Sequence, residues 1–186
     1  MKGKDKITND EIIYAIPKYI DDQGDLSMIL NEKGKKLTMP FHIRTLIRRL
    51  AYENYTDLVS VRRRLQEQFG QKNMLPYPLH SRLILIPVKV RKPRLKKDGA
   101  FGYINYVWVE DIQKQDKYCT ILFKNKCNLK VLQQYQSVKA KMIQGAWIQD
   151  CFLPQLQYNT NKVQEYQCRE ELQQIIGQLM DMYKEL

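Results

Sequence analysis

Thirteen Lys and Arg side chains in the middle of the chain have the chemistry and the spacing for binding a polyanion. Their ammonium and guanidinium groups carry a positive charge and several hydrogen-bond donors, which suits them to phosphate oxygens. They form three clusters, on two expected helices and on a Pro-containing connection, with one lysine after the second helix. The members are Arg44, Arg48, Arg49, Arg62, Arg63, Arg64, Lys72, Lys89, Arg91, Lys92, Arg94, Lys96 and Lys97.

These clusters account for the charge of the whole chain. Between Lys33 and Lys97 there are 17 Lys and Arg against three acidic residues, a balance of +14, while the chain as a whole carries +11. Residues 98–186 carry ten basic and ten acidic side chains, and residues 1–32 carry four basic and seven acidic ones. One positive block in an otherwise near-neutral chain indicates a surface for a polyanion, and nucleic acid is the commonest polyanion in a cytoplasm.

Catalytic and metal-binding patterns are poorly represented. The two histidines, His42 and His80, belong to no HExxH motif, and the chain has neither GxSxG nor a GK[ST] phosphate loop. We expect both to be surface or capping residues. The cysteines lack CxxC or other metal-type spacing and are expected to be reduced thiols; they are Cys119, Cys127, Cys151 and Cys168. The sequence therefore predicts no enzyme, no cofactor and no metal site.

Two other functions remain open from the residues alone. Tyr103, Tyr106 and Trp108 alternate along an expected strand, as a stacking platform for single-stranded DNA or RNA would require. Packing of one strand face in the core is the commoner reason for such a pattern. An enzyme acting on nucleic acid ranks last, because no carboxylate pair lies beside the basic block.

Composition predicts a folded protein of the cytoplasm. The chain has 186 residues, 44% of them hydrophobic and 27% charged, which is ordinary for one domain spanning residues 1–186. No apolar stretch approaches the roughly 20 residues that cross a bilayer. The first residues contain charges but no apolar core of a secretion signal. We therefore expect neither membrane insertion nor secretion.

A pair of amphipathic helices should present the first two basic clusters. The first is expected from Phe41 to Tyr52, opened by Pro40, with Arg44 and Arg48 one turn apart on the polar flank. Its apolar side is predicted to contain Ile43, Leu46, Ile47, Leu50 and Ala51. The second is expected from Asp57 to Phe69, capped by Thr56 and ended by Gly70. Arg62 and Arg63 should share a surface there, while Arg64 diverges.

The remaining pattern predicts an α+β fold, a mainly antiparallel sheet with this helical pair and two helices at the C-terminal end. Asp21–Asp25 should be a solvated turn, and residues 74–78 should be irregular. Pro17 is expected to end the first strand, and Pro87 to bend its strand or place it at an edge. Strands are expected over 11–16, 26–30, 35–39, 82–90, 103–109, 119–124 and 127–132, and helices over 137–152 and 163–183.

Three segments of this chain resemble the ComK family of bacterial competence transcription factors. Residues 84–112 are similar to the family's aliphatic-Pro strand and Gly–aromatic–Ile strand entry. Residues 120–152 resemble its hairpin, its Tyr-x-Ser helix start and its Ala-Trp-aliphatic helix centre at Ala146, Trp147 and Ile148. Residues 39–55 resemble its Met-x-Pro/Phe helix with basic residues. The similarity runs over about residues 11–155.

The resemblance implies a double-stranded DNA-binding transcription activator that contacts the minor groove of A/T-rich promoter sites and assembles on DNA as more than one subunit. Under this interpretation, the residues expected to enter the groove are Arg91, Arg94, Lys96 and Lys97. The residues expected to position the protein on the phosphate backbone are Arg44, Arg48, Arg49, Arg62, Arg63 and Lys72. The family's Gly-Arg-Lys turn is replaced here by Val61–Arg64.

Overall fold

The computed structural model describes residues 12–95 and 98–155. The chain divides into two compact units, residues 1–148 and 149–186, and the architecture below is that of the first. Lys96, Lys97 and the helix expected over 163–183 lie outside the described residues. Every helix within the described ranges is too short or too polar to cross a lipid bilayer.

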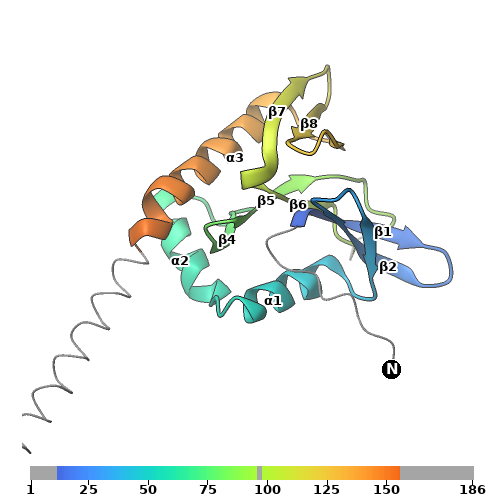
Figure 1. The fold of residues 1–186 in the computed structure, drawn as a ribbon, viewed down its shortest axis with the longest axis horizontal. Coiled ribbons are helices and arrows are strands. Elements are labelled where there is room, and N and C mark those ends of the chain that lie inside the picture. The colour runs from blue at the N-terminus through green and yellow to red at the C-terminus, as the bar shows by residue number, and fades with distance from the viewer. Residues whose placement is uncertain (1–11, 96–97, 156–186) are drawn as a thin grey trace, which may run out of the picture. The chain divides into compact units, whose positions relative to one another are not determined.

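A six-stranded antiparallel sheet forms the centre of the first unit (Figure 1). Most of its neighbours are joined by hairpins, and β1 and β6 pair across a long sequence separation through Tyr14 opposite Ile104. This arrangement confirms the predicted α+β class. In spatial order the strands are β3 (Lys36–Met39), β2 (Gly24–Asn31), β1 (Ile12–Ile20), β6 (Phe101–Asn105), β5 (Leu83–Lys89) and β4 (Tyr77–His80).

Both faces of this sheet are covered, which gives three layers (Figure 1). Helix α1 (Ile43–Glu53) packs on one face in a core with Ile29, Leu83 and Leu85. On the other face a second antiparallel sheet and helix α3 share a core with Ile86, Ile104 and Phe123. The second sheet has the order β7 (Val109–Lys114), β8 (Cys119–Phe123) and β9 (Asn128–Val131), and α3 spans Tyr135–Trp147.

Burial on both faces explains the apolar run of β5. Leu83 and Leu85 point toward α1, while Ile86 and Val88 belong to the opposite core. A strand packed on both sides needs apolar residues at consecutive positions instead of alternate ones. The hairpins predicted around residues 31–34 and 125–126 are also confirmed.

The helical pair is confirmed, with corrections at its ends. All five residues predicted for the apolar side of α1 are buried. However, α1 begins at Ile43, two residues after the predicted start at Phe41. His42 is the N-cap, and its Nδ1 accepts from the Arg44 N–H at 3.3 Å. Helix α2 (Leu58–Phe69) is capped by Asp57 instead of Thr56, and Gly70 ends it with φ 62° as predicted.

The predictions about the two strand prolines have different outcomes. Strand β1 continues through Pro17 to Ile20, so the prediction that Pro17 ends it is wrong. Strand β5 lies between β6 and β4, but at Pro87 it is paired with β6 alone, so the predicted edge position is confirmed locally. Each proline lies where its strand has a paired neighbour on one side only: pairing with β6 stops at Ala15, and pairing with β4 stops at Leu85. A proline nitrogen facing such an open side leaves no acceptor unsatisfied. Residues 74–76 are irregular as predicted, whereas Tyr77 and Pro78 of the same segment belong to β4.

The strand expected over 103–109 is interrupted. Strand β6 ends at Asn105, a single 3-10 turn covers Tyr106–Trp108, and β7 begins at Val109. The Asn105 side chain holds this break, since its Oδ1 accepts from Val107 N–H at 3.3 Å and its amide donates to Ile12 O at 3.0 Å. The turn carries the chain from the first sheet to the second. The helix expected over 137–152 is α3, which begins at Tyr135 and is followed by a π-helical turn over Ile148–Phe152.

The contact between α3 and β5 gives a first testable prediction. A Cβ at Gly145 would lie 2.6 Å from a Tyr106 ring carbon and 2.8 Å from Ile86 Cδ1. We expect Gly145→Ala to lower the free energy of unfolding by about 1–3 kcal/mol through overpacking. Gly99→Ala is the control, since its Cβ would meet only ordinary contacts at 3.5 Å and beyond. Equal denaturant midpoints for the two variants would contradict the packing described here.

Candidate nucleic-acid interface

The basic residues of α1 and α2 are exposed, and we call them together the helix basic surface. All six side chains, Arg44, Arg48, Arg49, Arg62, Arg63 and Arg64, are exposed. On α1 they lie outside the buried stripe that packs against the sheet. In the described part of the chain no carboxylate forms an ion pair with any of these arginines. Their charge is therefore directed to solvent or to a ligand.

Two members of this surface have contacts that restrict them. The Arg49 guanidinium lies 4.0 Å from the centre of the Phe41 ring. Arg62 donates to the Lys72 carbonyl at 2.9 Å and to Asn73 Oδ1 at 3.2 Å, which ties α2 to the segment that follows it. The Lys72 side chain is exposed. Arg62 thus combines an exposed position with a fixed orientation.

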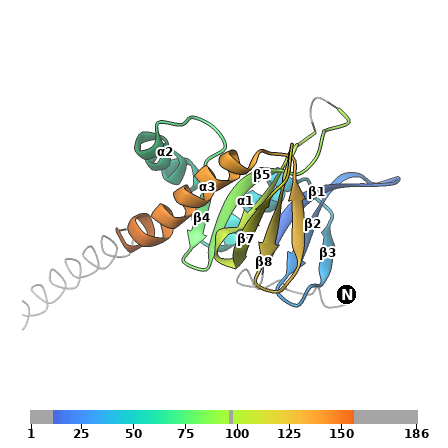
Figure 2. The same cartoon turned by 90° about the horizontal axis from the view of Figure 1, so that it is seen from above.

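Helix α2 is held at a few positions, and Leu58 in its first turn packs against the core under α1. Leu65 is its one buried residue. Phe69 packs edge-on against Trp147 of α3, and Lys141 of α3 donates to the Met74 carbonyl at 2.9 Å. Figure 2 shows α2 beyond β4, at that edge of the six-stranded sheet. A helix so little covered keeps most of its surface available for a partner.

The N-terminus of α2 has a favourable electrostatic arrangement. The pKa of the Asp57 carboxyl is lowered chiefly by the hydrogen bond from the Ser60 hydroxyl, then by the backbone N–H groups of Val59 and Ser60, and in smaller part by Arg63. Asp57 thereby satisfies the helix end, as an N-cap carboxylate does. Asp57 is thus engaged in capping α2.

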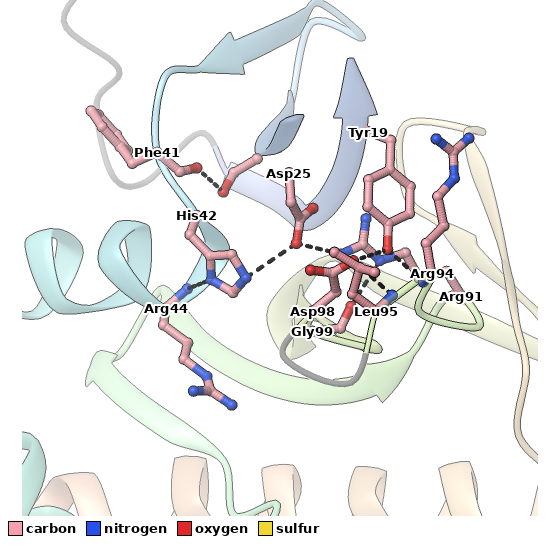
Figure 3. Close-up of polar contacts among 11 residues, drawn as sticks. Tyr19, Asp25, Phe41, His42, Arg44, Arg91, Arg94, Leu95, Asp98 and Gly99 are labelled. Atoms are coloured by element: carbon pink, nitrogen blue, oxygen red, sulfur yellow. Dashed lines mark hydrogen bonds and ion pairs between the residues drawn. The ribbon is translucent and has the colours of Figure 1, made fainter. Parts of the chain in front are cut away.

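The third cluster is divided by the structure into a buried residue and exposed ones. Arg91 lies at the root of the β5–β6 loop (residues 90–100), and 13% of its side chain is exposed. Its guanidinium donates to Asp25 Oδ2 at 2.6 Å, its Nε donates to the Gly99 carbonyl at 2.8 Å, and it lies over the Tyr19 ring (Figure 3). The structure does not place Arg91 to enter a groove, because its Nε and Nη2 are bonded inside the protein and its Nη1 is buried.

Other side chains of this cluster remain accessible. Lys92 and Arg94 are exposed, and the Arg94 guanidinium lies 4.4 Å from the centre of the Tyr19 ring (Figure 3). Lys89 is half-buried; its backbone N–H donates to Gln133 and its carbonyl accepts from Leu132. Of the two described loop residues expected to enter a groove, Arg91 and Arg94, the structure places Arg94 on the surface.

Sequence reasoning missed the residues that hold this loop. Asp25 was expected in a solvated turn, but it belongs to β2, its side chain is 11% exposed, and it also accepts from His42 Nε2 at 3.1 Å. The Tyr19 hydroxyl donates to Asp98 at 2.6 Å and accepts from the Arg94 N–H at 2.7 Å (Figure 3). Because these partners are far apart along the chain, no local pattern could have identified them.

This network joins the loop to the start of α1. His42 caps α1 and also contacts Asp25, which holds Arg91 (Figure 3). A Cβ at Gly99 would lie within 3.6 Å of His42 and Ile43. The base of the loop is therefore fixed beside the N-terminal end of α1, whose 11 residues span about 16 Å.

The aromatic residues considered for single-strand stacking do not form a platform. Tyr103 packs against the core under α1, with its ring 5.7 Å from that of Tyr77, and burial raises its pKa. Tyr106 and Trp108 pack against the opposite core. Trp108 also lines a hollow with Arg82, Val107 and Lys124. The three rings are thus divided between two cores, with Tyr103 on one side of the sheet and Tyr106 and Trp108 on the other.

No family model, curated protein or solved structure matches this chain. Among the residues that the structure describes, no group of three or more His, Cys, Asp or Glu side chains could hold a metal ion. Cys119, Cys127 and Cys151 are free thiols. The exposed basic residues of α1, α2 and the β5–β6 loop are therefore the candidate site, because their side chains suit phosphate binding.

Proposed function

We propose that this protein binds double-stranded DNA through the helix basic surface and activates transcription in the cytoplasm at A/T-rich sites, as ComK-type competence factors do. The observation that carries the proposal is the row of exposed arginines on two consecutive helices, unpaired with described carboxylates. Guanidinium groups on a rigid helix bind phosphate oxygens at low entropic cost, and phosphate contacts supply most non-specific affinity for DNA.

The roles of the basic residues follow from their surroundings. Six residues position the protein on the phosphate backbone of DNA, because they lie on or beside helices that the core holds in place. They are Arg44, Arg48, Arg49, Arg62, Arg63 and Lys72. Arg94 and Lys92 are the accessible loop residues that could enter a narrow minor groove, whose negative potential deepens in A-tracts. The competence function, the A/T preference and assembly as more than one subunit are supported by the resemblance in sequence.

A binding assay over a range of salt concentrations tests the proposal. If roughly six phosphates are neutralised per protein, log affinity for duplex DNA should fall with log salt at a slope near −5. The assay compares an A/T-rich duplex, a G/C-rich duplex and a single strand of the same length. We expect the A/T-rich duplex to bind most tightly. Affinity that does not change with salt would overturn the proposal, and a preference for the single strand would favour an unpaired nucleic acid as the ligand.

A further inference from the structure

The corner between α1 and α2 exposes two neighbouring tyrosines. Tyr52 at the end of α1 is 83% exposed, and Tyr55 in the connection is 99% exposed. Val59, in the first turn of α2, is 70% exposed. Single exposed apolar residues are common, but two aromatic rings and an aliphatic side chain within eight residues form a patch. We call Tyr52, Tyr55 and Val59 the corner patch.

The backbone of this corner is tightly fixed. The Tyr55 N–H donates to the Tyr52 carbonyl at 3.1 Å, and the Thr56 N–H donates to the Ala51 carbonyl at 2.9 Å. The Asn54 side chain donates to Leu50 O at 2.7 Å, and the Thr56 hydroxyl is 3.2 Å from Leu79 O on β4. The Tyr55 ring is therefore held out from a rigid turn, which lowers the entropic cost of binding.

Tyr55 also has a backbone conformation that tyrosine disfavours. Its φ is 51°, in the left-handed region where Asn and Gly are much commoner than aromatic residues. The turn would be less strained with Asn at this position, and no core contact of the ring offsets the strain. A ring that is exposed and unfavourable for the local backbone has the character of a binding residue.

Arginines flank the corner patch on both helices. Arg44, Arg48 and Tyr52 follow one another at intervals of four residues on α1, so they share a face. On α2 Val59 and Arg63 are related in the same way. A ligand of this surface must therefore offer flat apolar groups together with negative charge. Nucleic acid has both, since its bases stack on aromatic rings and its phosphates bind arginine.

The same charges disfavour a second copy of the chain as the occupant. In a twofold interface each copy contributes the same patch, so the arginines of one copy would face those of the other. Such an arrangement brings like charges together as the apolar groups are buried. A polyanion lowers the charge repulsion that a second copy would increase.

We propose that Tyr55, assisted by Tyr52, stacks on DNA bases. These bases have separated from their neighbours at the place where the helix basic surface binds the phosphate backbone. This inference rests on the proposed function and deepens it by adding a contact to bases. Apolar side chains that insert at a base step bend the duplex and are most effective where the step is easily opened. An unpaired site in the duplex removes the cost of opening, so the protein should prefer it.

The test uses an A/T-rich duplex, with and without a bulge of unpaired 2-aminopurine nucleotides, and three proteins. We expect the wild type to bind the bulged duplex more tightly and to change its 2-aminopurine fluorescence on stacking. Tyr55→Asn should lose about tenfold in affinity for the bulged duplex, the value expected for one stacked base. Its thermal stability should be equal to or higher than that of the wild type, because Asn suits the left-handed backbone. Tyr55→Phe keeps the ring and should bind like the wild type.

The outcomes separate this inference from the proposed function. If the wild type and Tyr55→Asn bind both duplexes equally, with the same salt slope, the DNA-binding function holds and the stacking role is overturned. If no protein binds either duplex, both proposals fail. If Tyr55→Asn alters self-association in sedimentation but leaves DNA affinity unchanged, the corner patch is a subunit interface and the stacking role is overturned.

Discussion

Replacing Arg44, Arg48, Arg63 and Lys72 together by Gln should weaken binding to every duplex by about a thousandfold near 0.15 M salt. The reason is that each lost phosphate contact lowers the salt slope by about 0.9. These four side chains are exposed, and no described carboxylate is ion-paired with them, so their removal leaves the core intact. The salt slope itself should decrease in magnitude by about 3 to 4. Titration of labelled A/T-rich and G/C-rich duplexes measures both quantities.

The second sheet offers a control with the same change in net charge. Lys114 and Lys130 lie on strands of the sheet that covers the opposite side from α1, Lys117 and Lys124 lie in its turns, and all four are exposed. Their replacement by Gln should leave the salt slope close to that of the wild type. If both quadruple variants lost affinity equally, overall charge instead of the helix basic surface would account for binding.

A loop variant separates positioning from sequence readout in the same assay. Phosphate contacts lower affinity about equally on all sequences, whereas a side chain in a groove changes the preference between sequences. Lys92→Ala with Arg94→Ala should therefore reduce the preference for the A/T-rich duplex while keeping most non-specific affinity. Loss of the preference in the helix variant alone would make the helices the reading element.

Arg91→Ala should lower the free energy of unfolding by about 3–5 kcal/mol, because it leaves the buried Asp25 carboxylate without its main cationic partner. The side chains of this pair are 13% and 11% exposed, and Asp25 receives a further contact from His42 alone among the described residues. Denaturant unfolding followed by far-ultraviolet circular dichroism measures the effect. A stability loss of this size identifies Arg91 as a structural residue of the loop.

Arg94→Ala is the matched control, since Arg94 lies over the same Tyr19 ring but is exposed and has no ion pair in the described chain. We expect it to cost at most about 1 kcal/mol, as for exposed cation–π contacts. Adding Asp25→Asn to Arg91→Ala should restore part of the stability, because the unpaired charge is removed. If Arg91→Ala and Arg94→Ala were equally stable, the buried network in Figure 3 would not hold the loop.

The exposed loop residues and the structural one cannot be told apart in the sequence. Arg91 and Arg94 are three residues apart in a uniformly basic segment, and both suit a groove-binding role by composition. Arg91 differs because a carboxylate 66 residues away lies beside it once β2 and β5 belong to the same sheet. The exposure of the tyrosines in the corner patch could not be predicted from the sequence either. Tyr52 directly follows apolar residues, and whether its ring is exposed depends on where α1 meets the sheet.

What the sequence alone determined is local. Helical spacing identified the buried side of α1, Gly70 identified the end of α2, and the charge count identified the basic block, because each depends on neighbours within a few residues. The tertiary structure decided whatever depends on distant partners. Pro17 and Pro87 are compatible with strands only because the adjoining strands stop short, and Asn105 ends β6 through a bond to Ile12. Arg91 is internal because folding brings Asp25 to it, and a contact between residues 66 positions apart leaves no periodic trace in a sequence.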